Sequence, residues 1–284
     1  MYAVTGITGQ VGGAVARTLL DAGRQVRAVV RDASKGIAWQ DRGCEVALAD
    51  LSDVAATTDA LREVEAAFLL IPPLFDPAPG FPEVRSLVAG LRMAILEARP
   101  GRLVCLSTIG AQATQPNLLG QLGLVEDALG DLPLPVAFLR AAWFMENFAG
   151  DMAGARDGKI SSFLQPLSKP FPMVATADIG RLAASMLQEH WTGRRVVELE
   201  GPARITPNEV AIAFGKVLAR PVEAEILPRD TWEALFQSQG MQNPTPRAQM
   251  LDGFNEGWLE FQGKALKGET PIESVLASLS HRGS

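Results

Sequence analysis

Thr5-Gly6-Ile7-Thr8-Gly9-Gln10-Val11-Gly12 is the stretch of sequence that decides the fold. It follows a short apolar run, Tyr2–Val4, and leads into an amphipathic helical pattern, Val11–Ala22. In a strand–turn–helix, three such glycines give a tight turn, close backbone approach to a pyrophosphate, and close helix–strand packing. The first helical turn also presents unpaired N–H groups and partial positive charge to phosphates. A merely tight turn is the other interpretation, but the pattern favours a dinucleotide site at Gly6, Thr8, Gly9, Gln10, Val11 and Gly12.

Short apolar runs continue to alternate with helical patterns as far as Arg140. The runs are almost continuously apolar, as strands buried on both faces of a sheet must be. Alternating strands and helices favour a parallel sheet covered on both sides, with right-handed crossovers. The fold class predicted is therefore α/β, a doubly wound parallel sheet of the Rossmann type. Its further elements are expected to be the strands Val26–Val30, Val46–Ala49, Ala67–Ile71, Leu103–Leu106 and Val136–Leu139 and the helices Val54–Val64, Pro82–Ala98 and Leu119–Leu129.

The rest of the chain lacks this alternation and predicts a smaller, irregular C-terminal lobe for substrate. We expect residues 1–150, with contributions from about 174–200, to form the nucleotide-binding core. Residues 151–284 are expected to form the lobe, interleaved with the core. Because ligands bind outside the carboxyl ends of such strands, the cleft should lie between the two parts. Later elements are expected to be a helix over 178–188 capped by Asp178, a strand at Val196–Leu199 and a helix over 207–218.

The tip of the second strand distinguishes the two nicotinamide dinucleotides. NAD-binding proteins carry a carboxylate there for the ribose 2′-OH, whereas an arginine nearby accommodates the 2′-phosphate of NADP. Arg31 stands at the tip, and Lys35 adds a second positive charge, although both also suit ordinary solvated surface positions. Asp32 falls one residue late and suits a helix cap. The tip therefore favours NADP(H) as the cofactor.

Residues after other strands are candidates for the walls of the same site. Asp50-Leu51 follows the third strand, where a carboxylate can bond the adenine amino group; a helix cap together with Ser52 is an equal alternative. The fourth strand leads into Leu70-Ile71-Pro72-Pro73, of which the first three are candidate cofactor contacts and Pro73 a candidate substrate contact. The proline-rich stretch over 72–82 suggests an adaptable lid or simply a structured connection.

Composition excludes several classes of protein. A net charge of −6 argues against a broad electrostatic footprint for nucleic acid. No apolar run approaches the roughly 20 residues of a membrane span, and the chain begins directly with a strand, so we expect a soluble cytoplasmic protein. The two cysteines, Cys44 and Cys105, lie in apolar stretches and are expected to be buried free thiols. Cysteines and histidines are scattered without the spacing of metal ligands, so no metal site is expected.

The combined motifs resemble those of the NmrA-like family, a branch of the atypical short-chain dehydrogenase/reductases. The resemblance spans roughly residues 2–230 and implies NADP(H) binding. Members of this family are quinone and dye reductases, isoflavone-reductase-like enzymes, and redox sensors that bind the nucleotide without turning it over. Besides the glycine turn, the resemblance rests on Val30-Arg31, Leu106–Ala111, Leu139–Phe148, Ala177–Arg181 and the run from Gly201-Pro202 to Thr206–Glu209.

The wider superfamily uses a Tyr-x-x-x-Lys pair, in which the tyrosine donates the proton and the lysine lowers its pKa. This chain lacks the pair, because its single tyrosine is Tyr2, inside the first strand. No lysine occurs between Lys35 and Lys159, and the stretch that often carries one in NmrA-like reductases is Gly120–Glu126. His190 and His281 suit surface or capping positions. Any chemistry here therefore proceeds without that acid–base pair.

Hydride transfer to a quinone or a cationic dye needs no strong protein acid, since the protein contributes orientation and a dry cleft. Ser107 and Thr108, after the fifth strand, are weak catalytic candidates that can hydrogen-bond a carbonyl or the nicotinamide carboxamide, or cap the following loop. Glu126 is a remote candidate for proton handling, with a solvated helical carboxylate as the favoured interpretation. Candidate substrate contacts after the sixth strand are Trp143, Phe144 and Asn147, although helix packing is an equal role for the two aromatic residues.

Three functional hypotheses remain. The favoured one is an NADPH-dependent reductase of quinone-like or other aromatic small molecules, without nucleic-acid or membrane partners. The second is a non-catalytic NADP(H) sensor that regulates a protein partner, consistent with the missing pair. The third, an isomerase, epimerase or dehydratase, suffers most from that absence. A homodimer is also possible, since the C-terminal aromatic residues suit either a pocket or an interface: Trp232, Phe236, Phe254, Trp258 and Phe261.

Overall fold

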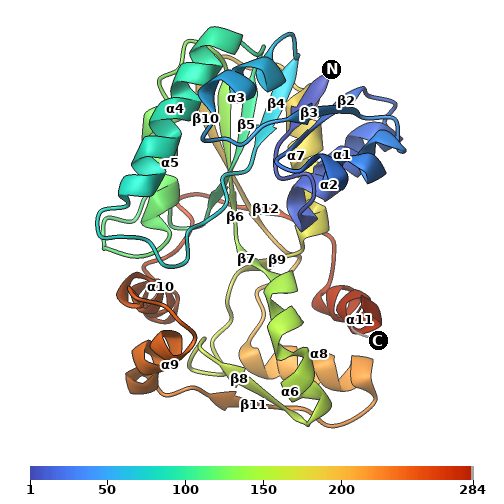
Figure 1. Ribbon diagram of the computed structural model, residues 1–284. Helices are drawn as coiled ribbons and strands as arrows, with labels where there is room; N and C mark the ends of the chain where they lie inside the picture. Colours follow the sequence, from blue (N-terminus) through green and yellow to red (C-terminus); the bar gives the residue numbers. More distant parts are fainter. Residues whose placement is uncertain (283–284) are drawn as a thin grey trace.

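The computed structural model describes residues 1–282 and contains a parallel sheet in the order β12-β10-β6-β5-β4-β1-β2-β3 (Figure 1). Every neighbouring pair of strands in this sheet is parallel. This order confirms the predicted doubly wound Rossmann fold, with β10 and β12 extending the sheet beyond β6. The strands are β1 (Tyr2–Val4), β2 (Val26–Val30), β3 (Glu45–Leu48), β4 (Ala66–Leu69), β5 (Leu103–Thr108), β6 (Val136–Ala141), β10 (Arg194–Glu200) and β12 (Leu266–Lys267).

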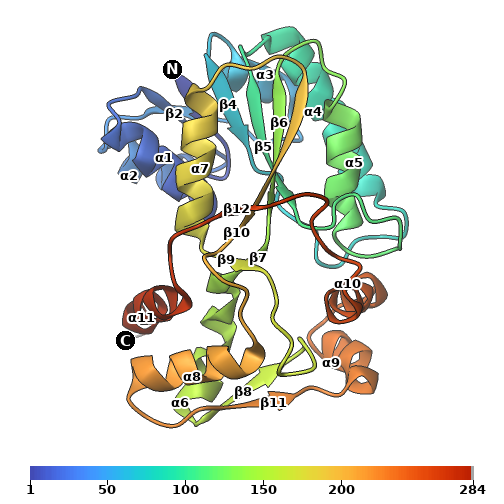
Figure 2. The same cartoon turned by 180° about the vertical axis from the view of Figure 1, so that it is seen from behind.

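Helices cover both faces of the sheet (Figures 1 and 2). One face buries Val15 of α1 and Ile179 of α7, while the other buries Ile95 of α4 and Val125 of α5. The helices α1 and α7 approach closely, because a Cβ on Gly180 would lie 2.3 Å from Cβ of Ala14. The covering helices are α1 (Gln10–Asp21), α2 (Ala33–Gln40) and α7 (Thr176–Gln188) on one face, and α3 (Val54–Leu61), α4 (Pro82–Ala98) and α5 (Gly120–Leu129) on the other.

Two local expectations need correction. The helix α7 begins at Thr176, so Asp178 is not its cap; it lies buried in the first turn, where its carboxylate accepts hydrogen bonds from Thr270 N (3.0 Å) and Oγ1 (2.9 Å). The helix α2 was not expected, because its sequence has little apolar periodicity. Asp32 begins this helix by accepting a hydrogen bond from Ser34 N, which confirms the capping role suggested for Asp32.

The remaining elements lie beyond the carboxyl ends of the sheet, where β6 continues directly into β7 (Figure 1). They enclose a separate apolar cluster that includes Phe171, Phe214, Trp232 and Phe236. These elements are the strands β7 (Trp143–Phe144), β8 (Lys159–Ser162), β9 (Met173–Val174) and β11 (Glu223–Ile226), and the helices η1 (Met145–Asp151), α6 (Met152–Arg156), α8 (Pro207–Leu218), η2 (Arg229–Thr231), α9 (Trp232–Ser238), α10 (Thr245–Glu256) and α11 (Ile272–Arg282). The boundary at residue 150 stays a prediction.

The chain returns to the sheet after α10, since the segment that contains β12 crosses to α11 (Figure 2). Cys44 and Cys105 are buried free thiols, as expected. Burial raises the pKa of the Cys105 thiol, so this cysteine acts as a small apolar residue. None of the helices in the described part of the chain is long and apolar enough to cross a membrane.

Candidate functional site

The glycine turn between β1 and α1 has a geometry that requires glycine. Gly6 has a φ of +61°, and a Cβ on Gly12 would lie 2.3 Å from the carbonyl oxygen of Gly6. Gly9 is the N-cap of α1 and has no side chain to cover the first turn. The N–H groups of Gln10, Val11 and Gly12 therefore have no partner within the helix and remain available to a phosphate.

Thr5, which the sequence did not single out as a contact, ties this turn to the end of β4. Its Oγ1 accepts a hydrogen bond from Leu70 N at 2.8 Å and lies 3.2 Å from Phe68 O. Leu70 packs beneath the turn, since a Cβ on Gly6 would lie 3.2 Å from Cβ of Leu70. Of the predicted contacts that follow Leu70 in the chain, Ile71 is buried, and Pro72 and Pro73 are exposed.

The adenosine end of the expected site carries exposed charge. Arg31 lies exposed at the end of β2, and Lys35 is exposed in the first turn of α2. Asp50 follows β3, where Ser52 donates to its Oδ1 from both N (2.9 Å) and Oγ (2.7 Å). These hydrogen bonds, with the nearby charge of Arg31, lower the pKa of the Asp50 carboxyl group. Asp50 therefore forms a local turn with Ser52, while Asp53 caps α3.

The half-buried Leu51 lies beside this turn. Arg31 and Lys35 thus lie exposed at the tip of β2, where the 2′-phosphate is predicted to bind, and Asp50 follows β3, where a contact to the adenine amino group is predicted.

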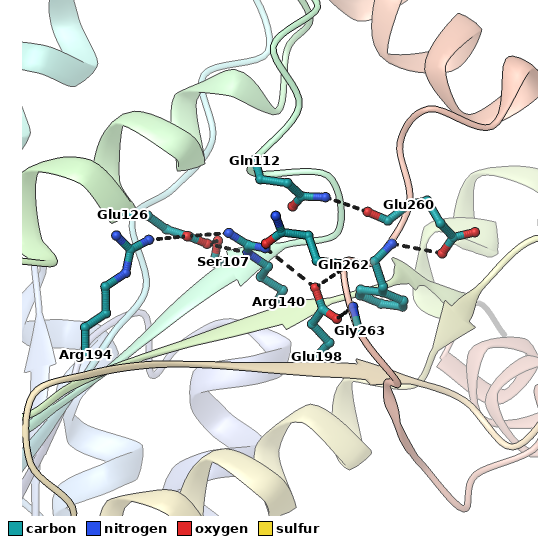
Figure 3. A network of polar contacts seen from close by, with 10 residues as sticks. Ser107, Gln112, Glu126, Arg140, Arg194, Glu198, Glu260, Gln262 and Gly263 are labelled. Carbon is teal, nitrogen blue, oxygen red and sulfur yellow. Dashed lines mark hydrogen bonds and ion pairs between the residues drawn. The ribbon is translucent and has the colours of Figure 1, made fainter.

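The ends of β5 and β6 meet a buried carboxylate, Glu126 of α5 (Figure 3). Arg140 of β6 donates to Glu126 from Nε (2.8 Å to Oε1) and Nη2 (2.7 Å to Oε2). Ser107 Oγ donates to Oε1 at 2.6 Å, and Arg194 Nη2 to Oε2 at 3.0 Å. Glu126 is only 2% exposed, so the favoured expectation of a solvated helical carboxylate is wrong. These partners compensate the buried charge of Glu126. The Ser107 hydroxyl donates its hydrogen bond to Glu126 and is not available to a ligand.

The same network fixes a C-terminal segment across the ends of the strands (Figure 3). Arg140 Nη1 donates to Gln262 Oε1 at 2.7 Å. The carboxylate of Glu198 in β10 accepts from Gln262 N (2.9 Å) and Gly263 N (2.8 Å). Gln112 Nε2 donates to the carbonyl oxygen of Glu260 at 2.8 Å. The network therefore positions backbone on both sides of β6.

Ser107 and Thr108 are the last residues of β5 rather than the start of a loop. Ser107 is buried against Glu126, whereas Thr108 is half-buried. Within residues 1–282, the hydroxyl of Thr108 has no hydrogen-bond partner. Of the two weak catalytic candidates, Thr108 is the one with a free hydroxyl.

The predicted substrate contacts lie on β7 and η1. Trp143 packs edge-on against Phe254 of α10, with ring centroids 5.4 Å apart, so part of its ring serves packing. Phe144 packs against the apolar core of the sheet, and Asn147 is exposed. Trp143 and Asn147 share the lining of a cavity of about 60 Å³ with residues of the lobe. Two of the three candidates therefore face a common space.

The proline-rich loop after β4 is attached to the lobe. Asp76 accepts hydrogen bonds from Gln242 N (2.9 Å) and Asn243 N (2.6 Å). On the sheet side, Leu74 N donates to Oε1 of Gln121 in α5 at 3.2 Å. The loop is held at both sides by these bonds; its role as a lid stays a prediction.

The structure places the single tyrosine away from this site. Tyr2 begins β1, and its hydroxyl donates to Glu65 Oε2 at 3.3 Å, at the opposite end of the strand from Gly6. His190 is exposed after α7, and His281 Nδ1 lies 2.6 Å from the carbonyl oxygen of Ala277 within α11. Residues 1–282 contain no group of three His, Cys, Asp or Glu side chains placed to hold a metal ion.

The buried pairing of Glu126 with Arg140 was not predicted, although the sequence carries a usable pattern for it. Arg140 interrupts an otherwise apolar strand, and a charge in such a run signals a buried partner. On α5, the buried positions are Gln121, Val125, Glu126 and Leu129, so helical periodicity places Glu126 on the covered face. The two patterns together predict a buried ion pair.

Comparison with protein families matches the model described as the NmrA-like family, over residues 2–93 and 109–264. Among curated proteins, quinone oxidoreductase 2 of Escherichia coli is 27% identical and covers 99% of this chain and 98% of its own length. NAD(P)H azoreductase of Xenophilus azovorans is 26% identical over 85% of this chain and 82% of its own.

Solved structures of reductases also match this chain over nearly its full length. The NADPH complex of the Escherichia coli NADPH-dependent quinone oxidoreductase matches with a TM-score of 0.80 and 25% identity, covering the whole of both chains. A triphenylmethane reductase from Citrobacter sp. matches with a TM-score of 0.79 and 21% identity, over 98% of each chain, which shows a shared fold.

Proposed function

Because this chain belongs to the NmrA-like family, we propose that it is an NADPH-dependent reductase that transfers hydride to a quinone-like or other aromatic electrophile, without a Tyr–Lys pair. The observation that carries the proposal is full-length similarity to quinone oxidoreductase 2 in a chain whose glycine turn keeps its phosphate-binding geometry. The azoreductase among the relatives supports the class of aromatic acceptors.

NADP(H) fits the residues present. The pyrophosphate would lie on the amides of Gln10, Val11 and Gly12, where a side chain at position 12 has no space. The 2′-phosphate would lie between Arg31 and Lys35, both exposed and both positive. Asp50, with its lowered pKa, stays ionised there and offers an acceptor to the adenine amino group.

When bound, NADPH supplies the hydride. The protein positions the acceptor at the ends of β5 and β6, where the hydroxyl of Thr108 can donate a hydrogen bond to a carbonyl oxygen of a quinone. A quinone gains one hydride and one proton to become a hydroquinone, and water supplies the proton. Orientation and exclusion of water are the main contributions of this chain.

The test is a titration with NADPH and NADH, followed by the absorbance of the reduced nicotinamide with a panel of quinones and cationic dyes. We expect binding that prefers NADPH and oxidation that depends on the acceptor. Tight binding without oxidation by any acceptor would contradict the reductase and favour a nucleotide sensor. Failure to bind either nucleotide would contradict both.

The 2′-phosphate assignment is tested by Arg31→Glu. Loss of a hydrogen-bonded charge pair costs about 1.5–3 kcal/mol, so NADPH affinity should fall by about tenfold to a hundredfold while NADH affinity changes little. Arg42→Glu is the matched control, because Arg42 is an exposed arginine on the turn that leads into the amino end of β3. Equal losses for NADPH and NADH would refute the assignment.

A further inference from the structure

Two arginines of the lobe lie over aromatic rings of α9 and differ in their partners. The guanidinium carbon of Arg229 lies 5.0 Å from the ring centroid of Trp232, and its Nε and Nη2 donate to Asp252 at 2.6 and 2.8 Å. Arg247, in the first turn of α10, lies over Phe236 at 4.2 Å. Within residues 1–282, the guanidinium of Arg229 has a counter-charge, whereas that of Arg247 has none.

The positive charge of Arg247 is poorly compensated. In the described part of the chain, its guanidinium has one hydrogen-bond contact, from Nη1 to the sulfur of Met241 at 3.6 Å, and a thioether is a weak acceptor. The side chain is half-buried, and burial lowers the pKa of the guanidinium because less water solvates its charge there. Arg27, which is half-buried as well, has the carboxylate of Glu45 at 2.6 Å. Arginine stays charged in proteins, so Arg247 keeps donors that are free for a ligand.

The first turn of α10 borders the loops that follow β4 and β5 (Figures 1 and 2). Leu118 N, in the loop after β5, donates to the carbonyl oxygen of Pro246 at 2.9 Å. Asp76, in the loop after β4, accepts hydrogen bonds from two backbone amides just before α10. Both loops leave the carboxyl end of the sheet, so Arg247 lies near the loops that border the candidate site.

The spacing of residues along α10 relates Arg247 to the candidate substrate contacts. Arg247 and Phe254 are seven residues apart, and residues at this spacing lie on one face of a helix. Phe254 packs against Trp143, the candidate substrate contact that follows β6. At a rise of about 1.5 Å per residue, Arg247 lies about 10 Å from Phe254 along the helix. One face of α10 therefore leads from the end of β6 to the free guanidinium.

The free edge of the guanidinium indicates the kind of group that it binds. Nη1 of Arg247 points to Met241, which leaves Nε and Nη2 on one edge of the planar group. Such an edge matches the two oxygens of a carboxylate through parallel hydrogen bonds. A single guanidinium compensates one negative charge, so a carboxylate fits better than a doubly charged phosphate. Stacking on Phe236 holds the plane of the guanidinium in place.

We propose that Arg247 binds a carboxylate of the acceptor, about 10 Å from the aromatic group that lies beside Trp143 and receives the hydride. The assignment rests on the proposed reductase function and specifies its substrate class, an aromatic electrophile with an acidic side chain. The carboxylate takes no part in hydride transfer. Arg247 therefore contributes to binding and specificity, and the chemical step is the same for acidic and neutral acceptors.

The direct test uses a ligand that cannot be reduced. Naphthylbutanoate and its neutral amide are titrated by calorimetry into the protein saturated with NADP⁺, which occupies the phosphate-binding turn. The acid should bind about tenfold more tightly than the amide, because a hydrogen-bonded charge pair is lost in the amide. Arg247→Gln should abolish this preference, whereas Arg229→Gln, the matched control over Trp232, should keep it. Equal affinities in the wild-type protein, or a preference that survives in Arg247→Gln, would overturn the proposal.

A kinetic test separates this proposal from the proposed function. The acceptors are a naphthoquinone with a butanoate chain and its methyl ester. Arg247→Gln should raise KM for the acid by about tenfold, to the level of the ester, and leave kcat within about twofold. An equal rise in KM for the acid and the ester would contradict the proposal. If the wild-type protein reduces neither quinone, the reductase function fails, and the binding of the acid and the amide alone decides on Arg247.

Discussion

Two carboxylates, the buried Glu126 of α5 and the half-buried Asp151 at the end of η1, have opposite surroundings. Glu126 accepts hydrogen bonds from Ser107, Arg140 and Arg194. Asp151 has no partner among the described residues, and its pKa is raised by burial to about 6. A paired buried charge is a structural element, because the donors it needs are already built in. A half-buried carboxylate without a partner costs stability when it is ionised, because burial disfavours its charged form.

The largest expected effect comes from breaking the paired side. Arg140→Ala leaves Glu126 buried with only Arg194 and Ser107, and removal of one partner of a buried ion pair costs about 3–5 kcal/mol. The free energy of unfolding, measured by urea denaturation, should fall by this amount. Arg194→Ala is the control: the Arg194 side chain is 40% exposed, so its loss should cost about 1 kcal/mol or less. Equal losses in the two variants would contradict a structural role centred on Arg140.

The next effect has the opposite sign. The folded state raises the pKa of Asp151 from 3.8 to about 6, so the folded protein holds a proton that the unfolded chain has lost between those values. Stability therefore falls as pH rises from about 4 to 6, and the full penalty, about 3 kcal/mol, is present above pH 6. Asp151→Asn removes the penalty, so it should stabilise the protein at pH 8 and have no effect below pH 4.

The measurement for Asp151→Asn is urea denaturation of the variant and wild type over this pH range. A destabilised variant at pH 8 would show that Asp151 has a stabilising partner, and the contrast with Glu126 would disappear.

A smaller effect is expected at Ser107. Ser107→Ala removes a hydrogen bond to a charged group, worth about 1.5 kcal/mol, and should lower the free energy of unfolding by that amount. NADPH affinity should change by less than about twofold, because the Ser107 hydroxyl already donates its hydrogen bond to Glu126. If Ser107 contacted the cofactor, as the sequence suggested, Ser107→Ala would cause a larger loss of NADPH affinity. Titration of the variant with NADPH distinguishes the two outcomes. Thr108→Ala is the companion variant. It should raise KM for the quinone, because the Thr108 hydroxyl is proposed to donate to the quinone carbonyl, and it should leave the free energy of unfolding nearly unchanged.

The sequence predicted the sheet and the glycine turn well, because both depend on local patterns. Continuous apolar runs marked six of the strands, and Gly6 and Gly12 are required by backbone contacts within one turn. The strand expected at Val196–Leu199 corresponds to β10, whereas β12 was not expected. The strand β12 has only two residues and pairs through long-range packing that local sequence does not encode.

The site was predicted less completely, because its charges depend on contacts between distant elements. Arg140 and Glu126 are 14 residues apart, and Gln262 joins them from 122 residues beyond Arg140. Asp151 looks like an ordinary aspartate in the sequence; only the folded structure half-buries it and thereby raises its pKa. The helix α2 was not placed, although Asp32 was recognised as a possible cap, because its residues show little apolar periodicity.

Hydride transfer from NADPH to an aromatic acceptor is the central claim, and isotope transfer tests it most directly. The protein is incubated with NADPH deuterated at both C4 positions and a cationic triarylmethane dye, and the reduced dye is examined by mass spectrometry. The central carbon keeps its label, because a C–H bond at that position does not exchange with water. We predict one deuterium in each molecule of reduced dye, with an equal amount of NADP⁺ formed. Tight NADPH binding without labelled product, for this dye and for the quinones of the panel, would contradict the proposed reductase.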